Sequence, residues 1–144
     1  MSCASVTFQK NLSKRDKVYT YIIDHTLSKE KSFERIDSWI AQNYKNAQKV
    51  IQLREKSDGA IVLKPVVSWI FGTTVICYSS YTLSIKTKDK KSRLVFELGT
   101  TTGSCYGPYP TVPAMESIKS EFEGIYLGIK KNLTMKNTAL DDNF

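Results

Sequence analysis

The chain has 144 residues, of which 41% are hydrophobic and 24% are charged, so we expect a single domain with one hydrophobic core. Its formal net charge of +7 would attract nucleic acid, anionic lipid headgroups or acidic glycans, although lysines that merely keep a protein soluble give the same charge. We find no apolar run long enough to span a bilayer. As written, the chain also lacks the apolar stretch of about 7–15 residues that a signal peptide needs.

The first part of the chain predicts a strand, a helix and a second strand. "KVYTYIID" (17–24) is rich in β-branched and aromatic residues, as strands are. Apolar residues then recur at spacings of three and four over about 28–45, which is typical of an amphipathic helix, and Thr26 or Ser28 offers its N-cap. "AQKVIQLRE" (47–55) alternates between apolar and polar residues and predicts a strand.

Three more strands are predicted in the middle of the chain. The Asp-Gly pair at 58–59 indicates a hairpin turn, because it supplies the positive φ angles that a tight turn needs. "AIVLKPVVSWIF" (60–71) follows as a strand in which Pro65 marks an edge position, a bulge or the strand's end. "TVICYSSYTLSIKTK" (74–88) and "RLVFELGT" (93–100) show half-apolar alternation, so we expect an antiparallel pair that is covered on one side only.

A loop and a second helix complete the predicted elements. Residues 100–113 are dense in Gly and Pro and predict a loop, and Pro113 suits the first turn of a helix. Apolar residues then step by three and four from Met115 to Leu133, which predicts a long amphipathic helix. The predicted order is therefore β-α-β-β-β-β-α.

These elements predict one α+β domain with a four- or five-stranded antiparallel sheet. Packing both helices on one face of the sheet buries every apolar stripe. The domain is expected over residues 17–135, after a loose polar arm at 1–16 and before a frayed tail at 136–144.

The sequence offers no signature of catalysis, and we expect a protein that is not an enzyme and that carries neither metal nor cofactor. His25 is the single histidine, whereas a metal site needs several ligands at workable spacing. A nucleophilic site would need a base beside a Ser or Cys, and no sequence signal supports a pairing of His25 with Cys77 or Cys105. "GTTTGSCYG" (99–107) lacks the Lys-Ser/Thr ending of a phosphate-binding loop.

Two groups of tyrosines are candidates for contact with a partner. Tyr106 and Tyr109 stand between glycine and prolines and are the best candidates for an exposed contact surface, the alternative being a stiff connection that packs on the core. A second group either holds single-stranded nucleic acid by stacking beside a basic groove or belongs to the core. It consists of Tyr21, Tyr78 and Tyr81 on predicted strands, with Lys86 and Arg93 nearby.

Three segments carry a family resemblance: "SWIAQNYKNAQKVIQ" (38–52), "EKSDGAIV" (55–62) and "YTLSIKTKDKKSRLVFE" (81–97). Over about residues 17–135, the chain resembles a bacterial family of unknown function with a TATA-binding-protein-like (TBP-like) fold. The resemblance implies this fold, members that are often secreted or lipid-anchored in Gram-negative bacteria, and no catalytic residues. The family turn usually reads Lys-Asp-Gly, whereas Lys-Asp-Lys stands at 88–90 and predicts a longer or bulged hairpin.

The resemblance bears on the first residues, "MSCAS". A bacterial lipoprotein signal ends with an apolar residue, small residues and the cysteine that is acylated. Ser2 fits the position just before that cysteine, and Cys3 followed by Ala4 and Ser5 fits the cysteine and what comes after it. The apolar segment would lie upstream of Met1, which would then be an internal methionine, a misassigned start or the first residue of a shortened chain. Together with the resemblance, this predicts a lipid anchor on Cys3. The rival is a cytosolic protein in which Cys3 is an ordinary residue of the arm.

With Cys3 acylated, Cys77 and Cys105 remain and could form a disulfide that ties the Gly- and Pro-rich loop to the sheet. We therefore expect a non-enzymatic binding or interaction module of the cell envelope, facing the periplasm and meeting the membrane through its lipid anchor only. Its partner would be an envelope protein or a glycan. The alternative is a cytosolic basic protein that binds nucleic acid, and an enzyme using His25 or Cys105 is a weaker third option.

Overall fold

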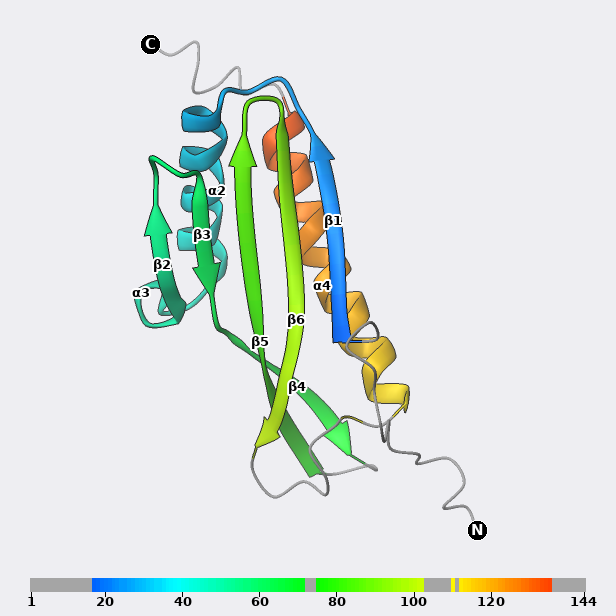
Figure 1. Cartoon of the computed structure of the whole chain (residues 1–144). Coiled ribbons are helices and arrows are strands. Elements are labelled where there is room, and N and C mark those ends of the chain that lie inside the picture. The colour runs from blue at the N-terminus through cyan, green and yellow to red at the C-terminus, as the bar shows by residue number, and fades with distance from the viewer. Residues whose placement is uncertain (1–16, 72–74, 103–109, 111, 136–144) are drawn as a thin grey trace.

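The computed structural model shows one antiparallel sheet with the helices α2 and α4 packed against one of its faces (Figure 1). We call this the inner face, and we call the opposite face, which no helix of the described part covers, the outer face. The structure describes residues 17–71, 75–102, 110 and 112–135. The elements are β1 (Val18–Asp24), α2 (Lys29–Asn43), α3 (Ala47–Val50), β2 (Ile51–Glu55), β3 (Ala60–Leu63), β4 (Val66–Phe71), β5 (Val75–Lys88), β6 (Lys91–Thr102) and α4 (Val112–Thr134). The predicted α+β architecture with helices on one face is confirmed.

The sheet contains six strands in the order β1-β6-β5-β3-β2, and β4 also pairs with β5. The predicted strand over 60–71 is divided at Pro65, so that β3 and β4 follow one another along the same edge of β5. Proline has no N–H to donate to a ladder, and here its carbonyl instead accepts a hydrogen bond of 3.0 Å from the N–H of Tyr81. Of the three roles left open for Pro65, the structure selects the strand's end.

The predicted strand over 47–55 is wrong in its first half. Residues Ala47–Val50 form a single helical turn, α3, and the strand β2 begins only at Ile51. Asn46 opens this turn in the left-handed conformation with a φ of 63°, which asparagine tolerates better than most residues. Alternation over so few residues does not separate strand from helix, and Ala, Gln and Lys all favour helix.

The predicted lengthening of the hairpin at residues 88–90 is also wrong. The strands β5 and β6 pair as far as Lys88 and Lys91, so Asp89 and Lys90 alone form the turn. Lys90 adopts a φ of 66°, which costs a residue with a side chain roughly 1–2 kcal/mol. A tertiary contact offsets this cost, because the N–H of Lys90 donates a hydrogen bond of 2.8 Å to the carbonyl of Leu27.

One hydrophobic core lies between the inner face and the two long helices. The second predicted helix is confirmed as α4, and the first as α2, with Ser28 rather than Thr26 as its N-cap. Among the helices that the structure describes, none has the length and apolar character that crossing a membrane requires. The predicted alternation of β5 and β6 is confirmed, since the following residues are all at most 4% exposed: Tyr81, Leu83, Ile85, Leu94, Phe96 and Leu98.

Candidate functional site

Four cationic side chains surround a hollow on the outer face, at the end of the β5–β6 hairpin. Lys86 and Lys88 of β5 lie directly opposite Arg93 and Lys91 of β6, respectively. Ile22 of β1, which is 48% exposed, pairs with Arg93 from the other side. These five residues line a hollow of about 290 Å³, which we call the cationic hollow.

The local fold explains why these side chains share a face. Residues two apart on a strand point to the same side of a sheet, so the spacing within each strand aligns the cations. The two-residue turn then sets the register that brings Lys86 opposite Arg93 and Lys88 opposite Lys91. Like charges directly opposite each other destabilise a sheet, so this register is one that electrostatics alone would disfavour.

Charge compensation at the cationic hollow is sparse. Within the described residues, one carboxylate forms an ion pair with any of the four cations, namely Asp24, whose Oδ1 lies 3.6 Å from the Nζ of Lys91. The charge of Lys86 also acts to lower the pKa of Glu55, although a hydrogen bond with Asp58 raises that pKa overall. The four lining cations and the Asp24 carboxylate together carry a formal charge of +3.

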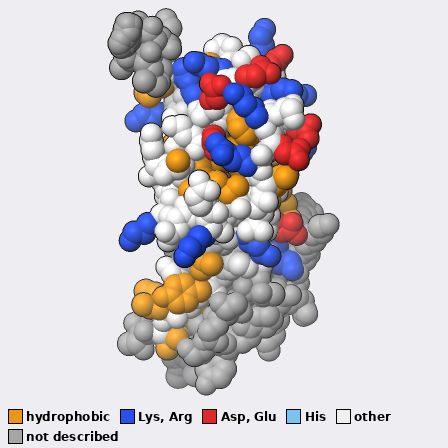
Figure 2. All heavy atoms as spheres, turned by 90° about the vertical axis from the view of Figure 1, so that its left-hand side faces the viewer, with side chains coloured by type: hydrophobic (Ala, Val, Ile, Leu, Met, Phe, Trp, Pro, Cys, Tyr) orange, Lys and Arg blue, Asp and Glu red, His pale blue; other side chains and the backbone are white. Residues whose placement is uncertain are grey.

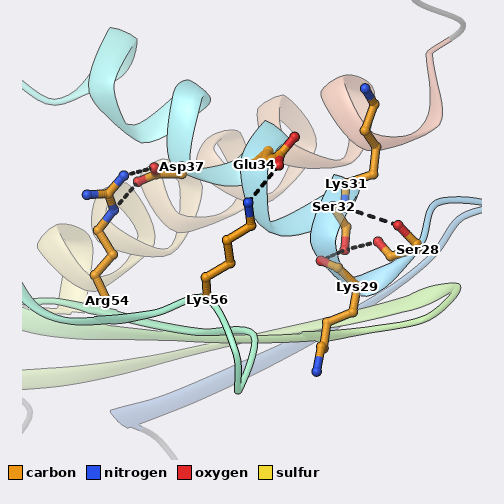
Figure 3. Close-up of polar contacts among 8 residues, drawn as sticks. All are labelled: Ser28, Lys29, Lys31, Ser32, Glu34, Asp37, Arg54 and Lys56. Atoms are coloured by element: carbon orange, nitrogen blue, oxygen red, sulfur yellow. Dashed lines mark hydrogen bonds and ion pairs between the residues drawn. The ribbon is translucent and has the colours of Figure 1, made fainter.

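Two cations outside the hollow also form ion pairs with acids. Figure 2 shows basic and acidic side chains intermixed on the side where β2 and α2 lie. Arg54 of β2 pairs with Asp37 of α2 through two hydrogen bonds, and Lys56, the residue after β2, pairs with Glu34 of α2 at 2.8 Å (Figure 3). Lys56 lowers the pKa of Glu34 by hydrogen bonding. What distinguishes the cationic hollow is therefore its geometry, because two pairs of cations lie directly opposite each other on neighbouring strands.

A buried polar network lies beneath the cationic hollow, on the inner face of the same hairpin. Thr87 and Ser92 are directly opposite each other, between the two cationic pairs, and their hydroxyl oxygens are 2.6 Å apart. The Ser32 hydroxyl of α2 lies 2.5 Å from that of Thr87. All three side chains are at most 1% exposed. The network therefore attaches the β5–β6 hairpin, whose outer face bears the four cations, to α2.

His25 completes this network from the segment that joins β1 to α2. The N–H of Leu27 donates a hydrogen bond of 3.1 Å to its Nδ1, so the neutral ring carries its proton on Nε2 and donates it to Ser92 Oγ at 2.9 Å. Burial lowers the pKa of His25, and the charge of Asp24 opposes this shift. His25 contacts Ser92, which pairs with Thr87 at one end of β5, whereas Cys77 lies near the other end, so the structure does not bring His25 and Cys77 together. The other pairing, His25 with Cys105, falls outside the described residues.

The tyrosines considered for nucleic-acid stacking are not brought together with Lys86 and Arg93. Tyr81 is 1% exposed and Tyr21 is half-buried, and both pack on the inner face, opposite the two cations. Tyr78 is 46% exposed, but it lies eight residues from Lys86 along β5, roughly 26 Å away.

Several predicted site residues lie outside the described residues: Cys3, Cys105, Tyr106 and Tyr109. Cys77 is fully buried in the core and is disulfide-bonded, and its pairing with Cys105 stays a prediction. In the ranges that the structure describes, no three His, Cys, Asp or Glu side chains gather where they could hold a metal ion.

The sequence interpretation included two of the four cations and missed the others. A signal was available, because Lys86, Lys88, Lys91 and Arg93 are spaced symmetrically about the turn. With a two-residue turn, this spacing places all four on one face. Because a longer or bulged turn was expected, the pairing of β5 with β6 that brings the four side chains to one face was not inferred.

Comparisons with known proteins give the family. The sequence profile of a family described as a domain of unknown function (DUF4468) with TBP-like fold matches residues 19–98, more than half of the chain. No curated protein matches the sequence.

Two solved structures share the fold. A TBP-like protein from Parabacteroides distasonis has a TM-score of 0.59 at 15% identity, over 83% of this chain and 96% of that one. A DUF4468 family protein from Bacteroides ovatus has a TM-score of 0.61 at 9% identity, over 96% of this chain and 98% of that one. The resemblance carried by the three sequence segments is thus confirmed, and the chain belongs to the DUF4468 family of domains with a TBP-like fold.

Proposed function

We propose that the protein is a non-enzymatic binding module of the cell envelope that binds an anionic partner at its cationic hollow. One observation carries this function: two like-charge pairs face each other on the open side of the sheet, with a single carboxylate in an ion pair among the described residues. At a separation of about 5 Å, two such charges repel by about 1 kcal/mol in water-like surroundings. An anion bound between the two cations is attracted to both of them, and these attractions outweigh the repulsion between the cations.

Retention on a heparin column tests the proposed surface, with this sulfated polysaccharide serving as a model anionic glycan. A variant carrying Lys86→Gln and Arg93→Gln is expected to elute at clearly lower salt than the unchanged protein, because both side chains line the hollow. The matched control carries Lys119→Gln and Lys131→Gln, which remove the same charge from exposed positions of α4. Equal shifts for the two variants would show that net charge alone sets retention, and would contradict the function.

Placement in the envelope is supported by the setting of Cys3 and by the family resemblance, whose members are often secreted or lipid-anchored. We expect the N-terminal peptide of protein isolated from its native cells to begin at Cys3 and to carry a diacyl- or triacylglyceryl adduct. Two or more acyl chains are what stable membrane anchoring requires. Mass spectrometry of that peptide is the measurement, and an unmodified peptide that begins at Met1 or Ser2 would contradict the anchor. Nucleic acid would then be the first ligand to test, with binding that weakens steeply as salt rises.

A further inference from the structure

We infer that the ligand of the cationic hollow is a single phosphate group carried by a small ester. This inference rests on the proposed function and names the class of anion that the hollow accepts. It is drawn from four features of the site: the spacing of the cations, the chemistry of Arg93, the volume of the hollow, and the position of Ile22 beside it.

The spacing of the cations suits one compact anion. Directly opposite residues on paired strands have Cβ atoms about 5 Å apart, and residues two apart along a strand are separated by about 7 Å. Lys86, Arg93, Lys88 and Lys91 therefore stand at the corners of a rectangle of roughly 5 by 7 Å on the outer face. Side chains of this length all reach a tetrahedral group at its centre.

The chemistry of the four side chains favours a phosphate dianion. Arg93 offers a planar fork of N–H donors that matches two oxygens of a phosphate, and the three lysines act as point charges around it. The formal charge of about +3 is enough to balance a dianion. The Asp24 carboxylate opposes binding, because it lies beside Lys91 at the rim and would repel the incoming anion.

The volume and the apolar wall define what the phosphate is attached to. The hollow measures about 290 Å³, which is near the lower end of small-molecule pockets and too small for a run of several nucleotides. Ile22 pairs with Arg93 and is 48% exposed, so it offers an apolar contact to the carbon side of the ester. A phosphomonoester with a short carbon backbone fills both parts of the site.

Calorimetric titration with glycerol phosphate at constant ionic strength tests this ligand class. Arg93→Gln is expected to weaken binding about tenfold, as the loss of a charge-assisted pair does. Asp24→Asn is expected to tighten binding, because it removes the one paired carboxylate. Lys119→Gln, an equal change of charge on α4, is expected to leave binding unchanged. Equal effects of Arg93→Gln and Lys119→Gln, or weaker binding by Asp24→Asn, would overturn the inference.

A second arm distinguishes the sources of the phosphate. Vesicles of phosphatidylcholine with and without phosphatidic acid present the same phosphomonoester on a membrane. Binding that depends on Arg93, either to glycerol phosphate or to phosphatidic acid vesicles, supports the phosphate site and assigns it to a soluble ester or a lipid headgroup. Binding to neither, with heparin retention that still depends on Lys86 and Arg93, overturns the phosphate site and leaves the proposed function standing. Loss of both overturns both.

An oligonucleotide arm separates a single phosphate from a phosphate chain. If single-stranded DNA binds far more tightly than glycerol phosphate, with an affinity that falls steeply with salt, several phosphates are being contacted at once. That outcome would overturn the single-phosphate site in favour of nucleic acid. Comparable weak affinities for the two probes, both lost in Arg93→Gln, would support it.

Discussion

Replacing Phe122 by alanine is expected to lower the free energy of unfolding by about 3–5 kcal/mol. The Phe122 side chain is 0% exposed and connects α4 to the sheet. Its ring stacks on Phe96 of β6 at 4.6 Å and meets the rings of Tyr81 at 4.8 Å and Tyr19 at 5.7 Å. Alanine leaves a cavity among three aromatic rings that are themselves held by strands, so the site collapses poorly. Since a domain of this size is stable by about 5–15 kcal/mol, this single change removes much of the stability.

Urea denaturation of the two proteins measures this effect. The matched control is Leu127→Ala on the same helix, because Leu127 is 54% exposed and its truncation is expected to cost less than about 1 kcal/mol. Phe122→Ala also removes the ring contact that Phe122 makes with Tyr19 of β1. The same strand positions Ile22 and Asp24 at the cationic hollow. A loss below about 1 kcal/mol for Phe122→Ala would show that the core repacks freely and would contradict the expectation.

The parts of the fold that the sequence predicted well are those where one periodicity runs over many residues. In β5, β6 and α4 the apolar pattern is long, so burial decides the structure and the pattern reports it. The predictions failed where contacts distant in sequence decide. The turn at Lys90 is stabilised by the carbonyl of Leu27, and no local signal in "KDKK" contains that contact.

The candidate site shows the same division. Tyr81 alternates with Lys86 along one strand, so the sequence itself already placed the tyrosine on the face opposite the lysine. The hydroxyl network at Thr87 and Ser92 was beyond prediction, because isolated polar residues at inner positions acquire meaning only when His25 and α2 are placed over them. Such a network specifies a position in a way that apolar packing does not.

Acidification is expected to destabilise the protein as the pH falls through the unfolded-state pKa of histidine, about 6.5. Burial holds the pKa of His25 below this value in the folded state. Between the two pKa values the unfolded chain therefore binds more protons than the folded protein, so the free energy of unfolding decreases as the pH is lowered. The contribution is complete above about pH 6.5 and is lost progressively below it. The geometry gives the cause, because Nδ1 accepts the N–H of Leu27 and a proton on Nδ1 would set two donors against each other.

His25→Gln separates this titration from the rest of the chain. At about pH 7.5 the variant is expected to be less stable by about 1–3 kcal/mol, because buried partners of the ring lose their hydrogen bonds. Between about pH 7.5 and 5.5 its urea midpoint should change less than that of the unchanged protein. Asp24→Asn serves as the opposite control, since it removes the charge that raises the His25 pKa and should steepen the acid loss. An unchanged pH dependence in His25→Gln would contradict the assignment.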